Sequence, residues 1–181
     1  PRLTSAALAI GTGVHKAAEV LVAALRNNRN PVVVLPEAEA TLEEAIDFER
    51  TMGDPDPEDA KFDTAKETGI GLVRALAESI PLYWEPVQSE KTIEAEVIPG
   101  VVVRGTPDLF LEDGAIVDFK TRRSKSNPAD LHRNLQFIAY SILRNATDAT
   151  PDHQREVRVV EITKTKVPAV HIQPTSRDAV D

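Results

Sequence analysis

Apolar residues in the first half of the chain recur at helical spacing. One stripe predicts a helix over about residues 11–26, and its members are Val14, Ala18, Leu21 and Leu25. Thr41 followed by Glu44 resembles a capping box and predicts a second helix over residues 42–51. A third helix is predicted over about residues 56–80, where an aspartate and a proline open the segment and a proline follows it. The run "PVVVLP" between the first two helices predicts an edge strand or an extended connector.

The second half of the chain alternates apolar and polar positions, a pattern typical of strands. The predicted strands cover about residues 92–98, 101–111, 115–120, 156–162 and 167–172. A helix over about residues 127–145 separates the third strand from the fourth. Its predicted core stripe consists of Leu131, Leu135, Ile138 and Ile142. This order of elements predicts an α/β protein with a mixed central β-sheet flanked by helices.

Chain length and composition predict one compact domain. The 181 residues are 41% hydrophobic, enough for a substantial core. We therefore expect a single domain over residues 1–181, with residues 31–90 as a helical insertion before the sheet; a start at Pro1 is compatible with a fragment of a longer protein. No apolar run approaches the roughly 20 residues that span a bilayer, so we expect no membrane partner.

Charge and cysteine content restrict the classes of site. The chain has no cysteine, which excludes disulfides, thiolate zinc sites and Cys-ligated iron–sulfur clusters. Its net charge of −8 is unusual for a nucleic-acid-binding protein, because phosphate contacts need Lys and Arg. Much of the basic charge, however, is concentrated in "KTRRSKSNPADLHR", and a local basic patch can bind nucleic acid on an acidic protein.

The segment "GTPDLFLEDGAIVDFKT" predicts two short apolar strands around a turn, yet each strand carries an aspartate, Asp108 or Asp118. A two-residue Asp-Gly turn would place the two carboxylates on opposite faces of the hairpin. A three-residue loop over residues 112–114, with its glycine in the left-handed conformation, would instead pair Asp108 with Asp118. Lys120 projects from the same face as Asp118, because side chains alternate along a strand.

Two carboxylates side by side in an apolar hairpin repel each other and require a proton, a cation or a salt bridge. A hard divalent cation such as Mg²⁺ or Mn²⁺ prefers oxygen ligands and would relieve the repulsion. Lys120 would then act beside the metal, on a scissile phosphate or a bound water. The structural alternative is that Lys120 neutralises Asp118 in an ion pair and that Asp108 caps a turn after Pro107.

Three motifs occur in an order that resembles a known family. Pro107-Asp108, a spacer and then Asp118-Phe119-Lys120 resemble the PD-(D/E)XK nuclease signature, and the surrounding residues resemble its RecB-like branch. "GTGVHKAAE" matches the upstream helix histidine of that branch, and "QFIAY" matches its Gln-x-x-x-Tyr motif on the helix after the catalytic strand. The closing "VRVVEITKTKVPAV" is similar to the last strand pair of such proteins. The resemblance implies a restriction-endonuclease-like αβββαβ core.

The resemblance also implies roles for individual residues. It implies a divalent cation, Mg²⁺ or Mn²⁺, whose ligands would be His15, Asp108, Asp118 and the backbone carbonyl of Phe119. Lys120 would complete the catalytic set with the two aspartates, and Gln136 and Tyr140 would bind the substrate near the cleaved bond. Its position alone indicates only that His15 is a residue at the boundary of the helix's apolar face.

Other polar residues have weaker assignments. Phosphate contacts that do not depend on base sequence are expected from four basic residues, Arg122, Arg123, Lys125 and Arg133. A solvated loop is the alternative for this basic run. Glu94 or Glu96 could approach the metal, although a solvated strand face explains both. Glu19 could orient His15, although a solvated helix position explains it equally.

The expected activity is hydrolysis of DNA phosphodiester bonds by a divalent-metal-dependent nuclease. The resemblance favours an exonuclease or end-processing enzyme of recombination, repair or phage replication, acting on single- or double-stranded DNA in the cytoplasm of a bacterial or phage-infected cell. The resemblance is compatible with an enzyme that acts as a homo-oligomer, or with a helicase or recombination protein as its partner. The alternative is a non-catalytic nucleic-acid-binding or assembly module that retains the nuclease fold.

Overall fold

The computed structural model describes residues 3–52, 54–55, 60–147 and 156–175. Its contacts divide the chain into two compact units. The helical unit comprises Pro1–Tyr83, Thr121–Ser124 and Ile162–Val170. The sheet unit comprises Trp84–Lys120, Lys125–Glu161 and His171–Asp181. The prediction of one nuclease domain over residues 1–181 stays a prediction.

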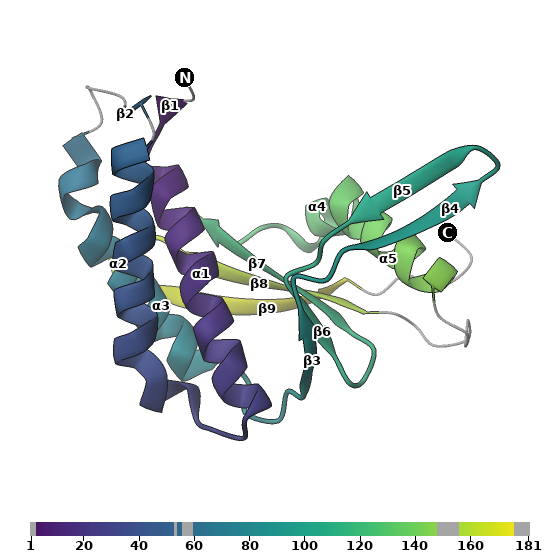
Figure 1. Ribbon diagram of the computed structural model, residues 1–181, viewed down its shortest axis with the longest axis horizontal. Helices are drawn as coiled ribbons and strands as arrows, with labels where there is room; N and C mark the ends of the chain where they lie inside the picture. Colours follow the sequence, from purple (N-terminus) through teal and green to yellow (C-terminus); the bar gives the residue numbers. More distant parts are fainter. Residues whose placement is uncertain (1–2, 53, 56–59, 148–155, 176–181) are drawn as a thin grey trace. The chain divides into compact units, whose positions relative to one another are not determined.

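Three helices build the core of the helical unit: α1 (Ala6–Arg26), α2 (Leu35–Met52) and α3 (Ala65–Ser79) (Figure 1). α1 begins five residues before its predicted start, because Ser5 caps it: the Ser5 hydroxyl accepts a hydrogen bond of 3.2 Å from Leu8 N. The predicted apolar stripe of α1 is buried throughout, and α1 packs against both α2 and α3. The short strand β1 (Leu3–Thr4) pairs in parallel with β2 (Asp54–Pro55).

By length and composition alone, α1 would be able to cross a membrane. This corrects the expectation that no apolar segment approaches that length. Of its most apolar 18-residue window, 56% is buried inside the protein. Packing against α2 and α3 therefore accounts for the apolar character of α1.

Two local predictions in the helical unit are wrong. The "PVVVLP" run forms a 3₁₀-helix, η1 (Pro31–Val34), that continues directly into α2. The run is helical because Asn30 caps it: the Asn30 side chain accepts a hydrogen bond from Val32 N at 3.0 Å. Pro31 then occupies the first helical position, to which proline is well suited. Thr41 lies inside α2, where its hydroxyl donates to Glu37 O, so it caps nothing. The predicted start of the third helix, at residues 56–59, lies outside the described residues; η2 (Ala60–Thr64) precedes α3.

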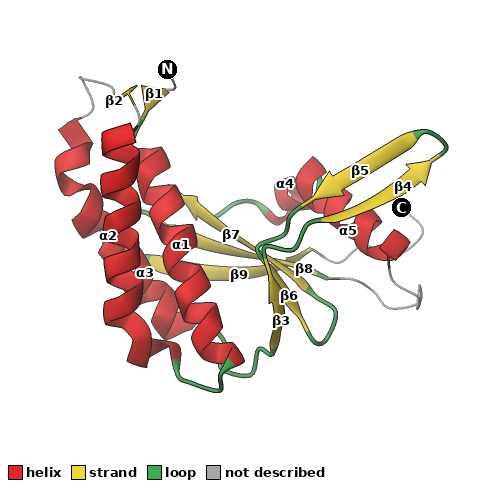
Figure 2. Ribbon diagram, viewed as in Figure 1, coloured by secondary structure: helices red, strands yellow, loops and turns green. Residues whose placement is uncertain are grey.

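A five-stranded sheet has the order β3-β6-β7-β8-β9 (Figure 2). Its strands are β3 (Pro86–Ser89), β6 (Leu109–Leu111), β7 (Ile116–Arg122), β8 (Val157–Thr163) and β9 (Ala169–Thr175). β6 pairs antiparallel with β3 on one side and with β7 on the other. β3 is an addition to the predicted strands. The predicted fold class, a mixed α/β fold with a central sheet and flanking helices, is confirmed.

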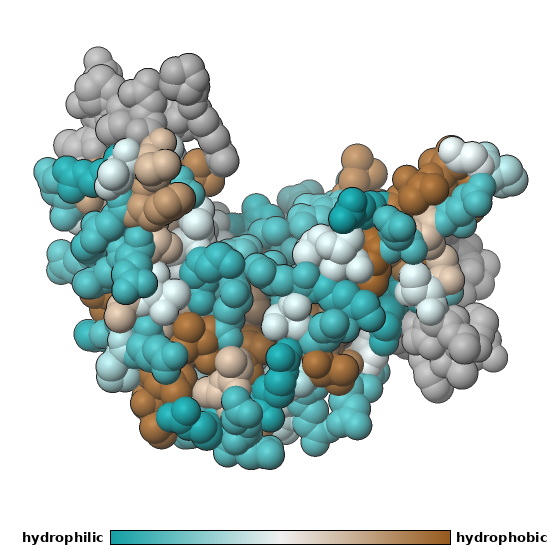
Figure 3. Space-filling view, viewed as in Figure 1, coloured by the Kyte–Doolittle hydropathy of each residue, from teal (hydrophilic) through white to brown (hydrophobic). Residues whose placement is uncertain are grey.

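The predicted strand over residues 101–111 is two strands that belong to different sheets. β5 (Val101–Gly105) pairs antiparallel with β4 (Ile93–Ile98) in a separate hairpin, and β6 begins after Pro107. The β4–β5 hairpin packs on the helix α5 (Leu135–Thr147), and its tip carries exposed apolar side chains (Figure 3). Glu94 and Glu96 are exposed on β4, so they occupy a solvated strand face.

The predicted helix over residues 127–145 is also two elements, α4 (Pro128–His132) and α5. The break occurs at Asn134, whose side chain accepts a hydrogen bond of 2.9 Å from Gln136 N and so starts a new helix. The break changes the phase of the apolar stripe. Leu135 and Ile142 are therefore 79% and 43% exposed, and the sheet unit's core takes Phe137, Tyr140 and Leu143 from α5.

Candidate functional site

The turn between β6 and β7 has the three-residue form. Leu111 N donates to Ala115 O at 2.9 Å, and Gly114, with φ of +86°, occupies the left-handed conformation. The register pairs Leu109 with Val117 and Phe110 with Ile116. Continued by one residue, this register sets Asp108 opposite Asp118, as the three-residue loop predicts.

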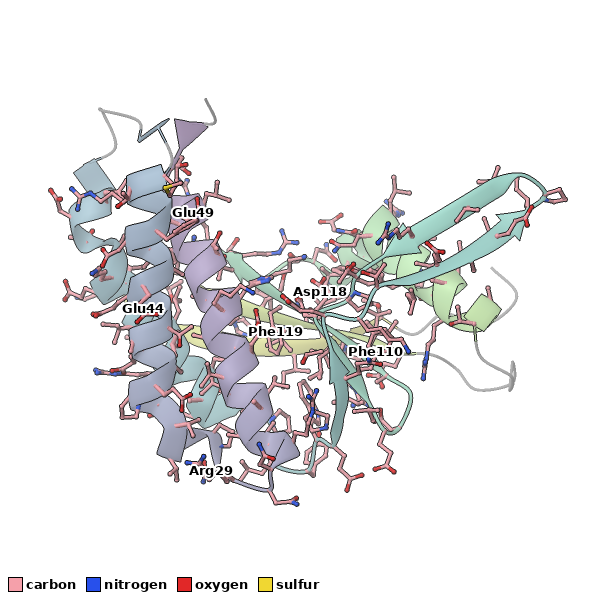
Figure 4. The ribbon with its side chains drawn as sticks, in the orientation of Figure 1. Arg29, Glu44, Glu49, Phe110, Asp118 and Phe119 are labelled. Atoms are coloured by element: carbon pink, nitrogen blue, oxygen red, sulfur yellow. The ribbon has the colours of Figure 1, made fainter. Side chains whose placement is uncertain are left out.

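The two carboxylates belong to Asp108, directly before β6, and to Asp118, within β7. Asp118 is buried, with 1% of its side chain exposed, and Asp108 is half-buried. Asp108 Oδ2 accepts a hydrogen bond of 2.7 Å from the backbone N–H of Phe119. Phe119 follows Asp118 on β7 (Figure 4). The carboxylate of one strand is thus fixed to the backbone beside the carboxylate of the other.

Lys120 lies on the same face of β7 as Asp118. Its Nζ is 2.9 Å from Asp118 Oδ2, and 26% of the lysine side chain is exposed. The ion pair offered as the structural alternative is therefore present. A buried carboxylate needs such a partner, because an unpaired buried charge is strongly destabilising.

Gln136 and Tyr140 extend the polar cluster from α5. Gln136 Nε2 donates to Asp118 Oδ1 at 3.2 Å and to the Tyr140 hydroxyl at 2.8 Å. The Tyr140 hydroxyl in turn donates to the backbone carbonyl of Thr106 at 3.1 Å. Burial raises the pKa of Tyr140 to about 12; the Gln136 hydrogen bond opposes this rise, and the charges of Asp118 and Asp108 add to it. The phenol therefore stays neutral and remains a donor at physiological pH.

The residues of this cluster fit a hard divalent cation in the type of donor they offer. Asp108 and Asp118 present carboxylate oxygens from adjacent strands, and Mg²⁺ and Mn²⁺ prefer such ligands. Within the described part of the sheet unit, no third carboxylate, histidine or cysteine joins them to form a complete ligand group.

His15, the predicted third side-chain ligand, lies in the helical unit. It is half-buried on α1, one turn after Gly11. A Cβ atom at Gly11 would be 3.4 Å from Thr121 Oγ1, so this glycine lets α1 approach the residue that follows Lys120. Glu19, the suggested orienting residue, is 2.6 Å from Lys16 Nζ in a surface ion pair. The metal-ligand role of His15 stays a prediction.

The basic residues predicted to contact phosphates divide between the units. Arg122 and Arg123 belong to the helical unit, where Arg122 O accepts a hydrogen bond of 2.7 Å from Lys164 N. Lys125 and Arg133 belong to the sheet unit and are exposed. The structure thus brings together Asp108, Asp118, Phe119, Lys120, Gln136 and Tyr140 in one unit.

The sequence predictions missed two polar groups of the sheet unit. Thr106 provides the carbonyl that fixes Tyr140, a role that a backbone atom does not reveal in sequence. Glu161 is fully buried on β8, where it accepts hydrogen bonds from Ser126 and Gln173. Its signal in the sequence is a carboxylate within the β-branched run "VRVVEIT", which is buried at nearly every position.

The fold is similar to that of a solved structure from Eubacterium rectale, named "Putative exonuclease". The two superpose with a TM-score of 0.53 at 16% sequence identity, over 75% of this chain and 53% of that one. At that identity the likeness shows the fold alone, and this chain spans about half the length of that protein. No curated protein matches the sequence.

Family membership follows from the sequence itself. The family model of the PD-(D/E)XK nuclease superfamily matches residues 1–180. The match includes the hairpin that carries Asp108 and Asp118, and the lysine two residues beyond Asp118. The chain belongs to the PD-(D/E)XK nuclease superfamily.

Proposed function

We propose that this protein is a divalent-metal-dependent deoxyribonuclease that hydrolyses phosphodiester bonds at the Asp108–Asp118 pair. The observation that carries the proposal is the polar contact around Asp118: Asp108 Oδ2 accepts a hydrogen bond of 2.7 Å from the backbone N–H of Phe119, and Lys120 Nζ lies 2.9 Å from Asp118 Oδ2. Nucleases of this superfamily generally use divalent metal ions such as Mg²⁺. The carboxylate pair offers the oxygen donors that such an ion prefers.

Asp108 and Asp118 would hold the cation, with His15 and the Phe119 carbonyl as further ligands. When bound, the cation supplies Lewis-acid stabilisation of phosphate charge and lowers the pKa of a water ligand.

Neighbouring groups fix the orientation of the carboxylates. The Phe119 N–H holds Asp108 through its hydrogen bond of 2.7 Å, and the Gln136 amide holds Asp118 at 3.2 Å. Lys120 positions the attacking water or stabilises negative charge on the phosphate in the transition state. Gln136 and Tyr140 bind the substrate near the cleaved bond.

The substrate is DNA, single- or double-stranded, recognised through its backbone. Arg122, Arg123, Lys125 and Arg133 contact phosphates, so binding does not depend on base sequence. We propose an exonuclease or end-processing role in recombination, repair or phage replication, in the RecB-like manner. The enzyme would act in the cytoplasm of a bacterial or phage-infected cell, as a homo-oligomer or with a helicase or recombination partner.

The test is cleavage of end-labelled single- and double-stranded DNA with Mg²⁺, with Mn²⁺ and with EDTA, by the wild type and by Asp118→Asn. We expect cleavage by the wild type with metal alone and a loss of at least about 100-fold in Asp118→Asn. Release of mononucleotides from an end indicates an exonuclease, and internal fragments of a circular substrate indicate an endonuclease. DNA binding without cleavage in every condition would instead support the non-catalytic binding module. Cleavage of RNA but not DNA would change the proposed substrate.

A further inference from the structure

A second buried carboxylate lies in the sheet unit, outside the Asp108–Asp118 pair. Glu161 on β8 is 0% exposed, and its carboxylate accepts hydrogen bonds from Ser126 and Gln173. Its Oε2 accepts hydrogen bonds from Ser126 N at 2.9 Å and from Gln173 Nε2 at 2.6 Å. Its Oε1 accepts a third hydrogen bond from the Ser126 hydroxyl. Two of the three bonds therefore fix a single residue, Ser126.

Ser126 lies at the junction between the basic run and the helix that follows it. Lys125, an exposed residue of the basic run, precedes Ser126. Asn127 follows Ser126 and caps α4, because its side chain accepts a hydrogen bond of 3.0 Å from Ala129 N. α4 leads through Asn134 into α5, which carries Gln136. Glu161 thus fixes the start of a segment that has a substrate-binding residue at each end.

The chemistry of the cluster favours a positioning role over simple core filling. A carboxylate costs free energy to bury, and an apolar residue would fill the same volume at lower cost. The carboxylate instead makes charge-assisted hydrogen bonds, about twice as strong as neutral ones, to a loop that no strand pairing holds. The Gln173 amide on β9 donates to the same carboxylate oxygen and, at 3.5 Å, to Ser126 O. It therefore orients Glu161 and Ser126 relative to each other.

We propose that Glu161 is a positioning residue for substrate binding: by fixing Ser126, it presents Lys125 to a backbone phosphate of the nucleic acid. The inference rests on the proposed nuclease function, because it needs a nucleic-acid substrate. Glu161 is not one of the proposed metal ligands, so we expect its effect to fall on affinity.

Two substitutions of Glu161 separate hydrogen bonding from charge. In Glu161→Gln, the amide oxygen can accept from Ser126 N and Gln173, and the amide NH₂ can donate to the Ser126 hydroxyl. This variant keeps all three bonds. In Glu161→Leu, the volume stays similar, but Ser126 N–H and the Gln173 amide lose their acceptor. Ser126→Ala is a milder variant that removes only the hydroxyl bond.

The experiment measures the dissociation constant of a fluorescent DNA duplex in EDTA, by anisotropy, over a range of salt concentrations. Binding without metal keeps the readout independent of cleavage. We expect Glu161→Leu to weaken binding by about tenfold. We also expect it to reduce, by about one, the slope of the logarithm of affinity against the logarithm of salt concentration, which is the change expected of Lys125→Ala. Glu161→Gln should remain within about twofold of the wild type, because its hydrogen bonds persist.

The decisive comparison is made in the Lys125→Ala background. There, Glu161→Leu should change the affinity by less than about twofold, because the contact it positions is already absent. If Glu161→Leu does not fold, Ser126→Ala replaces it, with an expected loss of about threefold in the wild-type background and none with Lys125→Ala. The inference would be overturned if the folded Glu161→Leu variant kept the wild-type affinity and salt dependence. It would also be overturned if the losses of affinity multiplied when Glu161→Leu and Lys125→Ala were combined. Either result would leave the proposed nuclease function standing. A wild type that binds no DNA would overturn the proposed function and this inference with it.

Discussion

The Asp108 carboxylate accepts a hydrogen bond of 2.7 Å from the backbone N–H of Phe119, across the hairpin from its own strand. This bond ties Asp108 to the residue next to Asp118. It exists only in the register that the three-residue turn sets, because a slip of one residue turns every side chain of a strand to the other face. The carboxylate pair therefore depends on a turn that contains none of the proposed catalytic residues.

Gly114→Ala tests this dependence. Gly114 has φ of +86°, and a side chain in that conformation costs about 1 kcal/mol or more. We expect the substitution to lower the free energy of unfolding by about that amount and to reduce DNA cleavage by at least about tenfold, because the turn shifts the register. Urea unfolding and the cleavage assay together measure the two effects.

Gly100→Ala is the matched control. Gly100 has φ of +80° at the tip of the β4–β5 hairpin, so the backbone strain should be similar. This control should lose similar stability yet keep its cleavage rate. Equal losses of cleavage in both variants would show that general destabilisation, and not register, explains the effect of Gly114→Ala.

Removal of the Lys120 ammonium should impair both stability and cleavage. Lys120→Met leaves the buried Asp118 carboxylate without its ion pair of 2.9 Å, which we expect to cost about 3 kcal/mol in EDTA. Cleavage should fall by at least about 100-fold. Asp118→Asn combined with Lys120→Met should recover part of the lost stability, because no buried charge is then left unpaired. A double variant less stable than Lys120→Met would contradict the ion pair as the origin of the loss.

Tyr140 should make stability fall at alkaline pH. Its pKa is raised to about 12 in the folded protein, because burial disfavours the phenolate. In the unfolded chain the value is about 10. Its contribution is therefore fully present below about pH 10 and is lost as the pH rises toward the folded value. The difference in unfolding free energy between the wild type and Tyr140→Phe should shrink from about pH 9 to about pH 11. A difference that grows over that range would contradict the raised pKa.

His15→Gln should raise the metal concentration needed for cleavage. If His15 is a ligand, half-maximal activity should need at least about tenfold more Mn²⁺, because an imidazole ligand is lost. His171→Gln is the control, since His171 is also half-buried but belongs to no family motif. An unchanged metal requirement in His15→Gln would remove His15 from the ligand set and leave a carboxylate site.

Sequence patterns predicted the elements whose determinants are local. The apolar stripe from Val14 to Leu25 and the alternation of β4 are regular, so the end of α1 and the whole of β4 lie close to their predicted places. The helix over residues 127–145 was wrong in its continuity and phase, because Asn134 restarts the helix through a side-chain bond to Gln136 N. A periodicity count averages over such a cap, and Leu135 therefore appeared in a core stripe that the structure does not contain.

The carboxylate pair was predictable because its members are ten residues apart on one hairpin. A count of turn residues was then enough to distinguish the two registers. Glu161 was not predictable in the same way. Its partners, Ser126 and Gln173, come from a loop and from another strand, and only the folded chain brings the three together.

We propose that Asp108 and Asp118 together hold the metal ion used for cleavage. Anomalous diffraction from crystals soaked in Mn²⁺ tests this most directly. We expect a peak bonded to carboxylate oxygens of both aspartates, at about 2.0–2.3 Å, and no such peak in Asp118→Asn. A Mn²⁺ peak that contacts neither aspartate, or one that persists at full height in Asp118→Asn, would contradict the account.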